Sequence, residues 1–247
     1  YGKITNRYNN RLSFNEGALK MIEIIAATIE DVKRIEKCGA DRIELVSALS
    51  EGGLTPSYSL IKRAVKSVNI PVNVMIRPHG KSFIYTDEEI ELMVEDIIIA
   101  KELNVNGVVF GVLDKNNEIC VPSLEKLLKA CDGIDVTFHR AIDDMLDPVK
   151  GIEVLASFGQ IKNVLTSGGK GDILKNIPVI KNMVNKSNHI NLIVGGGLNI
   201  KNIKEIMEET KAPAYHFGTA VRNDKSMVGE INTDNLRLLV NTINKQK

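Results

Sequence analysis

From residue 21 onward, the chain alternates short runs of β-branched residues with longer segments of helical period. The short runs read as strands and the longer ones as amphipathic helices. The predicted strands are 22–26, 42–46, 72–76, 107–111, 136–139, 163–165, 191–194 and 214–217. The predicted helices are 29–38, 58–68, 87–104, 123–132, 147–158, 172–186, 199–209 and 234–244. Strands that alternate with helices in this way predict successive βα units around a parallel sheet.

The number of strands decides between the two common parallel architectures. Eight strands favour a closed (β/α)8 TIM barrel over an open doubly wound sheet, which typically has five or six. No Gly-x-Gly-x-x-Gly follows the first strand, which further disfavours a dinucleotide-binding sheet. We therefore predict an α/β fold, a single TIM-barrel domain over residues 21–247.

The first twenty residues differ from the rest of the chain. Residues 1–20 are rich in Asn and Arg and show no apolar period. We expect them to be an N-terminal extension outside the domain, either flexible or introduced for expression, with a native N-terminal arm as the alternative.

Composition and charge limit the class of partner. Lys and Arg number 32 against 31 Asp and Glu, so the net charge of +1 offers no general attraction for nucleic acid or anionic membranes. No apolar run approaches the roughly 18 residues of a membrane span, and the N-terminus lacks the apolar stretch of a signal peptide. We expect a cytoplasmic protein whose partner is a small molecule or a metal ion.

The cysteines give no sign of a metal or redox centre. Cys38, Cys120 and Cys131 are odd in number and widely spaced, without a Cys-x-x-Cys pair. Reduced thiols that serve as small hydrophobic residues are the expected state.

Polar residues interrupt or end several predicted strands. The carboxyl ends of barrel strands meet at one mouth, so these side chains are expected to share a cavity. The alternative is a structural network in which Glu23 or Glu44 pairs with Arg42, Arg77 or Arg140. The polar residues at strand positions or strand ends are Glu23, Glu44, Arg77, His79, Thr137, His139, Arg140, Thr166, Ser167 and His216.

Glycines follow the last two strands, and long segments follow the second and third. Gly196 and Gly197 lie in a Gly-Gly-Gly turn after the seventh strand, where many barrels bind phosphate through backbone N–H groups. Tight turns without a ligand are the alternative. The segments 47–57 and 78–86 are longer than usual connections and are expected to wall the cavity, with Phe83 and Tyr85 covering a ligand.

Several strings resemble the motifs of the CutC family, which is linked to copper homeostasis, and they occur in the same order. The resemblance spans nearly all of 21–247 and implies a TIM barrel, usually oligomeric, with a role in cytosolic copper handling. A homo-oligomer is therefore expected. The matching strings are Gly-Ala-Asp-Arg-Ile-Glu-Leu (39–45), Leu-Ser-Glu-Gly-Gly-Leu-Thr-Pro-Ser (49–57), Val-Met-Ile-Arg-Pro (74–78), Val-Thr-Phe-His-Arg-Ala-Ile-Asp (136–143), Val-Leu-Thr-Ser-Gly-Gly (164–169) and Gly-Gly-Gly (195–197).

The chain departs from the family pattern at the residues associated with copper. The family's proposed copper ligands are cysteines in the first and second strands, in Glu-x-Cys and Glu-Leu-Cys patterns, and the corresponding residues here are Ile25 and Val46. Neither side chain can bind Cu(I), which prefers thiolate or thioether ligands. The family's Arg-Pro-Arg reads Arg77-Pro78-His79, which adds an imidazole. Copper as a cofactor is thus implied by the resemblance but without the cysteine ligands.

Two functions from different classes fit these residues. The first is an uncharacterised enzyme, a hydrolase, lyase or isomerase, in which Glu23 and Glu44 perform acid/base chemistry and His139 is an alternative proton carrier. In this hypothesis Arg77 and Arg140 orient a small polar or phosphorylated metabolite. Further substrate-binding residues would be His79, Thr137, Thr166, Ser167, Gly196, Gly197 and His216.

The second function is metal binding without catalysis. The imidazoles of His79, His139 and His216, together with Glu23 or Glu44, could supply N/O ligands for Cu(II) or zinc if the three rings converge. The leading candidate ligands are His139, His216 and Glu44.

Overall fold

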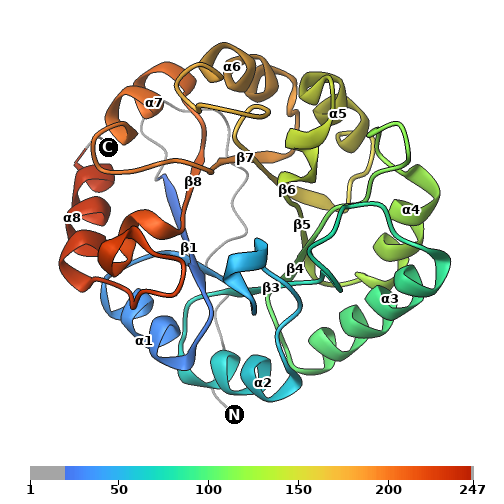
Figure 1. Cartoon of the computed structure of the whole chain (residues 1–247), viewed down its shortest axis with the longest axis horizontal. Helices are drawn as coiled ribbons and strands as arrows, with labels where there is room; N and C mark the ends of the chain where they lie inside the picture. The colour runs from blue at the N-terminus through green and yellow to red at the C-terminus, as the bar shows by residue number, and fades with distance from the viewer. Residues whose placement is uncertain (1–19, 246–247) are drawn as a thin grey trace.

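Eight parallel strands close into a barrel in the computed structural model, which describes residues 20–245 (Figure 1). Each strand pairs with its neighbours in chain order, and β1 also pairs with β8 to close the sheet. The strands are β1 (Met21–Ala26), β2 (Arg42–Leu45), β3 (Val72–Met75), β4 (Gly107–Phe110), β5 (Asp135–Phe138), β6 (Ile161–Thr166), β7 (Asn191–Val194) and β8 (Ala214–Phe217). The predicted single-domain TIM barrel is confirmed.

Eight α-helices of the described chain form a ring around the strands (Figure 1). They are α1 (Ile29–Lys37), α2 (Tyr58–Ser67), α3 (Asp87–Glu102), α4 (Val121–Ala130), α5 (Pro148–Leu155), α6 (Ile177–Lys186), α7 (Ile203–Thr210) and α8 (Thr233–Asn244). Short 3₁₀ helices also follow three strands: η1 (Leu49–Glu51) after β2, η2 (Arg140–Asp144) after β5, and η3 (Thr219–Val221) and η4 (Asn223–Lys225) after β8. Loops that carry these short helices therefore stand at the carboxyl ends of the strands.

Most predicted elements are confirmed with small shifts at their ends. The largest shift is in α6, which was predicted from residue 172 and begins at Ile177, where Pro178 occupies the first turn. Proline favours this position because its missing N–H has no partner in the first turn of a helix. The extension predicted for residues 1–20 lies outside the described residues except for Lys20 and stays a prediction.

Successive side chains along the strands belong to two different apolar clusters. Ile24, Leu45 and Val74 belong to the large core that includes the inward faces of the helices. Their neighbours Ile25 and Met75 form a separate small cluster with Val46 and Val109. Because strand side chains alternate between the two faces, this small cluster fills the interior of the barrel. Glu23 and Glu44 share the interior face, two residues before Ile25 and Val46, respectively.

None of the helices between residues 20 and 245 has the length and apolar character needed to cross a bilayer.

Candidate functional site

A cavity of about 280 Å³ lies at the carboxyl ends of the strands. Its wall includes Leu49, Gly52 and Phe83 from the loops after β2 and β3, as the length of those loops predicted. Tyr85, expected to cover a ligand, is not part of the lining, and its ring lies 5.1 Å from that of His79. The residues of the predicted site that line the cavity are Glu44, Arg77, His139, Arg140, Gly196, Gly197 and His216.

Five other predicted site residues lie outside the lining. Glu23 and Thr137 are fully buried, and Thr166 and Ser167 are buried within a hydrogen-bond network described below. His79 is not among the lining residues, and its Nε2 is paired with Glu89 Oε1 at 3.1 Å. Of the three imidazoles considered from the sequence, the cavity lining contains those of His139 and His216.

Four ionisable side chains from β1, β2 and β8 form a buried cluster, of which Glu44 and His216 line the floor of the cavity. Arg42 Nε donates to Glu23 Oε2 at 2.5 Å, and His216 Nδ1 lies 2.8 Å from Glu23 Oε1. The strand register explains these contacts, since Glu23 pairs in register with both Arg42 and His216. The second imidazole nitrogen of His216 lies 3.8 Å from Glu44 Oε2. His216 thus connects the two carboxylates.

The two glutamates of this cluster have opposite pKa shifts. Burial acts to raise the pKa of Glu23, but the charge of Arg42 and the hydrogen bond from His216 outweigh it and lower that pKa to about 2. Burial also raises the pKa of Glu44, and here it prevails, to about 7. Glu44 lacks an equivalent partner, because its Oε1 accepts no hydrogen bond from a described residue. Glu23 is consequently ionised at neutral pH, whereas Glu44 can gain or lose a proton.

His216 takes its protonation state from both carboxylates. Burial acts to lower the pKa of His216, but Glu44 and Glu23 together raise it above its ordinary value. Protonation of His216 is thus favoured by the same carboxylates that it contacts.

His139 is a neutral hydrogen-bond donor in this geometry. Burial and the charge of Arg77 lower its pKa to about 3. Its Nδ1 accepts the N–H of Ala141 at 3.1 Å, so the neutral ring carries its proton on Nε2, which has no partner among the described residues. The arrangement favours donation to a ligand over the proton-carrier role considered from the sequence.

Arg77 fastens two loops together. Its Nη1 donates to the backbone oxygens of Glu51 and Gly53 at 2.9 and 3.2 Å, and its Nη2 donates to Gly80 O at 3.4 Å. The guanidinium carbon also lies 4.8 Å from the centre of the Phe83 ring. These contacts use much of the hydrogen-bonding capacity that the sequence assigned to a substrate.

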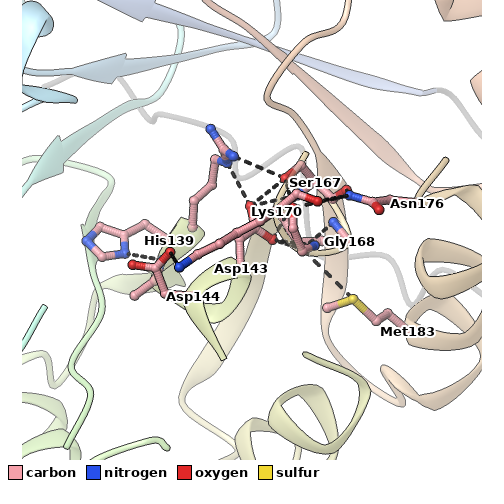
Figure 2. A network of polar contacts seen from close by, with 12 residues as sticks. His139, Asp143, Asp144, Ser167, Gly168, Lys170, Asn176 and Met183 are labelled. Atoms are coloured by element: carbon pink, nitrogen blue, oxygen red, sulfur yellow. Dashed lines mark hydrogen bonds and ion pairs between the residues drawn. The ribbon is translucent and has the colours of Figure 1, made fainter. Parts of the chain in front are cut away.

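Arg140 is held by a network centred on Asp143. Figure 2 shows Asp143 and Ser167 of this network. Arg140 Nε donates to Asp143 Oδ2 at 2.8 Å, and its Nη2 donates to Ser167 Oγ at 3.0 Å. Asp143 also accepts Thr166 Oγ1 at 2.5 Å, Ser167 N at 3.0 Å and Gly169 N at 3.2 Å. Thr166 and Ser167 therefore support Arg140 from behind the cavity wall.

Sequence reasoning missed Asp143. Its only sequence signal was its place at the end of the string 136–143, three residues after Arg140. Nothing local indicated that the β6 loop would fold over it.

Glu23, Glu44 and His216 could also hold a metal ion, because one ligand atom from each lies within 4.8 Å of the others. His139, the third metal candidate from the sequence, is not part of this group. The donors are oxygen and nitrogen, and the Arg42 guanidinium occupies one Glu23 oxygen. Ile25 and Val46, at the positions of the family's cysteines, pack in the apolar interior cluster, and no cysteine lines the cavity in the described chain. The group of Glu23, Glu44 and His216 supplies neither thiolate nor thioether, so it does not fit Cu(I).

Comparisons with known proteins agree with the motif strings. The model of the CutC family matches residues 20–221. A CutC family protein of Glaesserella parasuis is 42% identical over 197 residues, covering 79% of this chain and 81% of the relative. The human copper homeostasis protein cutC homolog is 39% identical over 208 residues, covering 84% and 76%.

Solved structures are similar to this chain at two levels. A crystal structure of CutC from Streptococcus agalactiae has a TM-score of 0.76 and 37% identity, and the match covers 80% of this chain and 97% of that one. Phosphoribosylanthranilate isomerase from Thermotoga maritima has a TM-score of 0.62 at 15% identity, covering 92% of this chain and 99% of that one, so it shares the fold alone. The family model, the relatives and the S. agalactiae structure together show that this chain belongs to the CutC family.

Proposed function

We propose that this chain is an enzyme that performs acid/base chemistry on a small polar metabolite at the mouth of the barrel. One observation carries the proposal: Glu44 lines the cavity with an unpaired carboxyl oxygen, next to an imidazole that a second, ionised carboxylate holds in place. A general acid or base is most effective when its pKa lies near the working pH, and the pKa of Glu44 is raised to about 7.

Each member of the cluster has a distinct part in proton transfer. Glu44 exchanges a proton with the substrate. His216 stabilises the charge on Glu44 and can return the proton, because its pKa is raised by both carboxylates. Glu23, ionised by Arg42, fixes the orientation of the imidazole through the Nδ1 contact of 2.8 Å. His139 Nε2 supplies a hydrogen bond to a substrate oxygen. Hydrolases, lyases and isomerases all use such proton transfers.

A screen of small metabolites tests this function. Wild-type protein, Glu44→Gln and Glu125→Gln are incubated with a pool of central metabolites, and consumption is followed by mass spectrometry. Glu125 is an exposed residue of α4 and provides a matched control for the loss of one carboxylate. We expect at least one metabolite to be converted by the wild type and by Glu125→Gln, with a loss of about 100-fold or more in Glu44→Gln, in line with general acid/base catalysis. Equal conversion by Glu44→Gln and the wild type would contradict the proposal.

Metal binding is the second candidate function, favoured by the proximity of Glu23, Glu44 and His216. The human relative is named a copper homeostasis protein, and in this chain the N/O donor set is suited to Cu(II) or zinc. Titration of each ion into the wild type, Glu44→Gln and His139→Ala distinguishes the candidates. Cu(II) or zinc affinity that falls only in Glu44→Gln supports a metal site in the cluster, whereas unchanged affinity in both variants rules out this site.

A further inference from the structure

The cavity has a second polar wall that the acid/base cluster does not use. It is formed by Arg140 on one side and by the turn after β7, with Gly196 and Gly197, on the other. Arg140 is the more exposed partner of its ion pair, with 48% of its side chain accessible against 4% for Asp143. Only Nε and Nη2 of the guanidinium are bound, and Nη1 has no partner among the described residues. A guanidinium edge is therefore available to a ligand.

The glycine turn offers backbone donors beside this edge. The N–H groups of Gly196 and Gly197 donate to no acceptor within residues 20–245. A Cβ at Gly196 would lie only 2.7 Å from Arg140 Cζ. The close approach of this backbone to the guanidinium therefore requires glycine. Both glycines have positive φ, +82° and +105°. The turn and the guanidinium therefore lie against each other in the cavity lining, and their N–H groups at Gly196, Gly197 and Arg140 Nη1 have no acceptor among the described residues.

Asp143 pairs with Arg140 without occupying the second edge of the guanidinium. Its carboxylate is buried, is not part of the cavity lining, and accepts hydrogen bonds from Arg140, Thr166, Ser167 and Gly169. These bonds fix one edge of the Arg140 fork and leave the other edge free. Figure 2 shows Asp143 close to Ser167 and Gly168 of the β6 loop.

We infer that Arg140, Gly196 and Gly197 bind the phosphate group of a small phosphorylated substrate, and that Asp143 positions the Arg140 guanidinium for this contact. A planar fork together with adjacent backbone N–H groups matches the several oxygens of a phosphate better than it matches a neutral group. The inference rests on the proposed function, because it names the substrate class for the same cavity. A phosphate held at this wall would anchor its substrate in the cavity whose floor holds Glu44 and His216.

Binding of inorganic phosphate tests the site without any turnover. Phosphate is titrated by calorimetry at constant ionic strength into the wild type, Arg140→Met and Lys170→Met. Lys170 is an exposed residue of the β6 loop that pairs with Asp144 at 3.2 Å, so it controls for the loss of one positive charge nearby. We expect saturable binding by the wild type and Lys170→Met, and affinity at least about tenfold weaker in Arg140→Met. No saturable binding by the wild type, or equal affinity in the two variants, would overturn the inference.

Gly196→Ala tests the glycine wall separately. The added Cβ would collide with Arg140, so we expect a loss of phosphate affinity of about tenfold or more. Gly133→Ala is the matched control, because Gly133 has φ +85° and a methyl group added there would have no atom within 4 Å. Equal phosphate affinity in the two alanine variants would contradict the role of the turn. A parallel titration with acetate identifies the anion, and acetate affinity equal to that of phosphate would overturn the phosphate assignment.

The positioning role of Asp143 needs a double-mutant cycle. Asp143→Asn is expected to weaken phosphate binding in the wild type and to have little further effect in the Arg140→Met background. Ser167→Ala, which removes the acceptor of Arg140 Nη2 and one hydrogen bond to Asp143 but keeps the Asp143 carboxylate, tests the positioning of Arg140 if Asp143→Asn fails to fold. A loss of the same size in both backgrounds would show that Asp143 does not act through Arg140. Glu44→Gln should bind phosphate normally, so the inference and the proposed function can fail independently.

Discussion

At the scale of single residues, identical side chains in this barrel have opposite chemistry because their neighbours differ. Glu23 and Glu44 are both buried on the interior face of adjacent strands, yet Arg42 and His216 contact only the first at hydrogen-bond distance. The cost of burying a charge is offset at Glu23 and remains at Glu44. One carboxylate is thereby a fixed anion and the other a proton carrier.

His139 provides a residue-scale prediction for the pH dependence of stability. Its pKa is lowered to about 3 in the folded protein, against 6.5 for the unperturbed group. The unfolded chain therefore binds a proton below pH 6.5 that the folded chain rejects, so His139 lowers the free energy of unfolding as pH falls from 6.5 toward 3, by about 1.4 kcal/mol per pH unit at most. Urea unfolding of His139→Gln should show a weaker loss over this range than the wild type.

Glu44 and His216 titrate with the opposite sign, so the comparison of variants isolates His139. Their raised pKa values make the folded state bind protons more tightly than the unfolded state, and that contribution to stability is lost as pH rises through the folded pKa. His189→Gln, at an exposed histidine, should keep the wild-type slope. A slope in His139→Gln identical to the wild type would show that the imidazole is not held neutral.

The sequence predicted the cavity residues better than their roles. Charged residues within buried strands indicated the interior site, because few explanations other than pairing or function exist for them. The division of charge between Glu23 and Glu44 depends on Arg42 and His216, which reach Glu23 only through the registers of β1 with β2 and β8. The tertiary contacts of Asp143 were invisible for the same reason.

At the scale of elements, the strands fix the floor of the site and the loops fix its walls. Strand and helix positions followed from apolar periodicity, and the largest shift, at the start of α6, occurs where Pro178 occupies the first turn. The loops after β2 and β3 were predicted as walls from their length. What the sequence could not indicate is that Arg77 would bind backbone oxygens in both, since backbone acceptors leave no mark in a sequence.

The hydrogen bonds from Arg77 to the loops after β2 and β3 give a prediction for hydrogen exchange. Arg77→Met removes the donors to the oxygens of Glu51 and Gly53, so the loop after β2 should open more often. We expect amide exchange in residues 49–54 to become several-fold faster, measured by mass spectrometry. Lys81→Met, at an exposed residue of the loop after β3, should leave exchange unchanged. Equal exchange rates in both variants would show that Arg77 does not hold the loop after β2 in place.

At the scale of the whole molecule, the barrel is closed by the pairing of β1 with β8. β1 and β8 come from opposite ends of the described chain, and α8 lies between α7 and α1 outside their junction (Figure 1). The buried face of α8 consists of Leu236, Leu239, Val240 and Ile243. Glu23 of β1 and His216 of β8 contact each other across this junction. A loss of pairing between the two strands would therefore also disrupt the site.

Adjacent leucines of α8 allow a matched test of how this helix packs outside the β1–β8 junction. Leu239 is 2% exposed and Leu238 is 55% exposed. Leu239→Ala should lower the free energy of unfolding by about 2 to 5 kcal/mol, whereas Leu238→Ala should change it by less than about 0.5 kcal/mol. Chemical denaturation measures both. Similar losses in the two variants would show that α8 does not pack as described.

The homo-oligomer and the cytoplasmic location expected from the sequence stay predictions.

The proposed chemistry requires one buried cluster to keep Glu23 ionised while Glu44 gains and loses a proton near neutral pH. Infrared difference spectroscopy of the wild type against Glu44→Gln, recorded across pH, follows the carboxyl stretch of Glu44 directly. The account predicts a protonated carboxyl band that disappears with a midpoint near pH 7, in keeping with the raised pKa of Glu44. A Glu44 band already absent at pH 5 would contradict it.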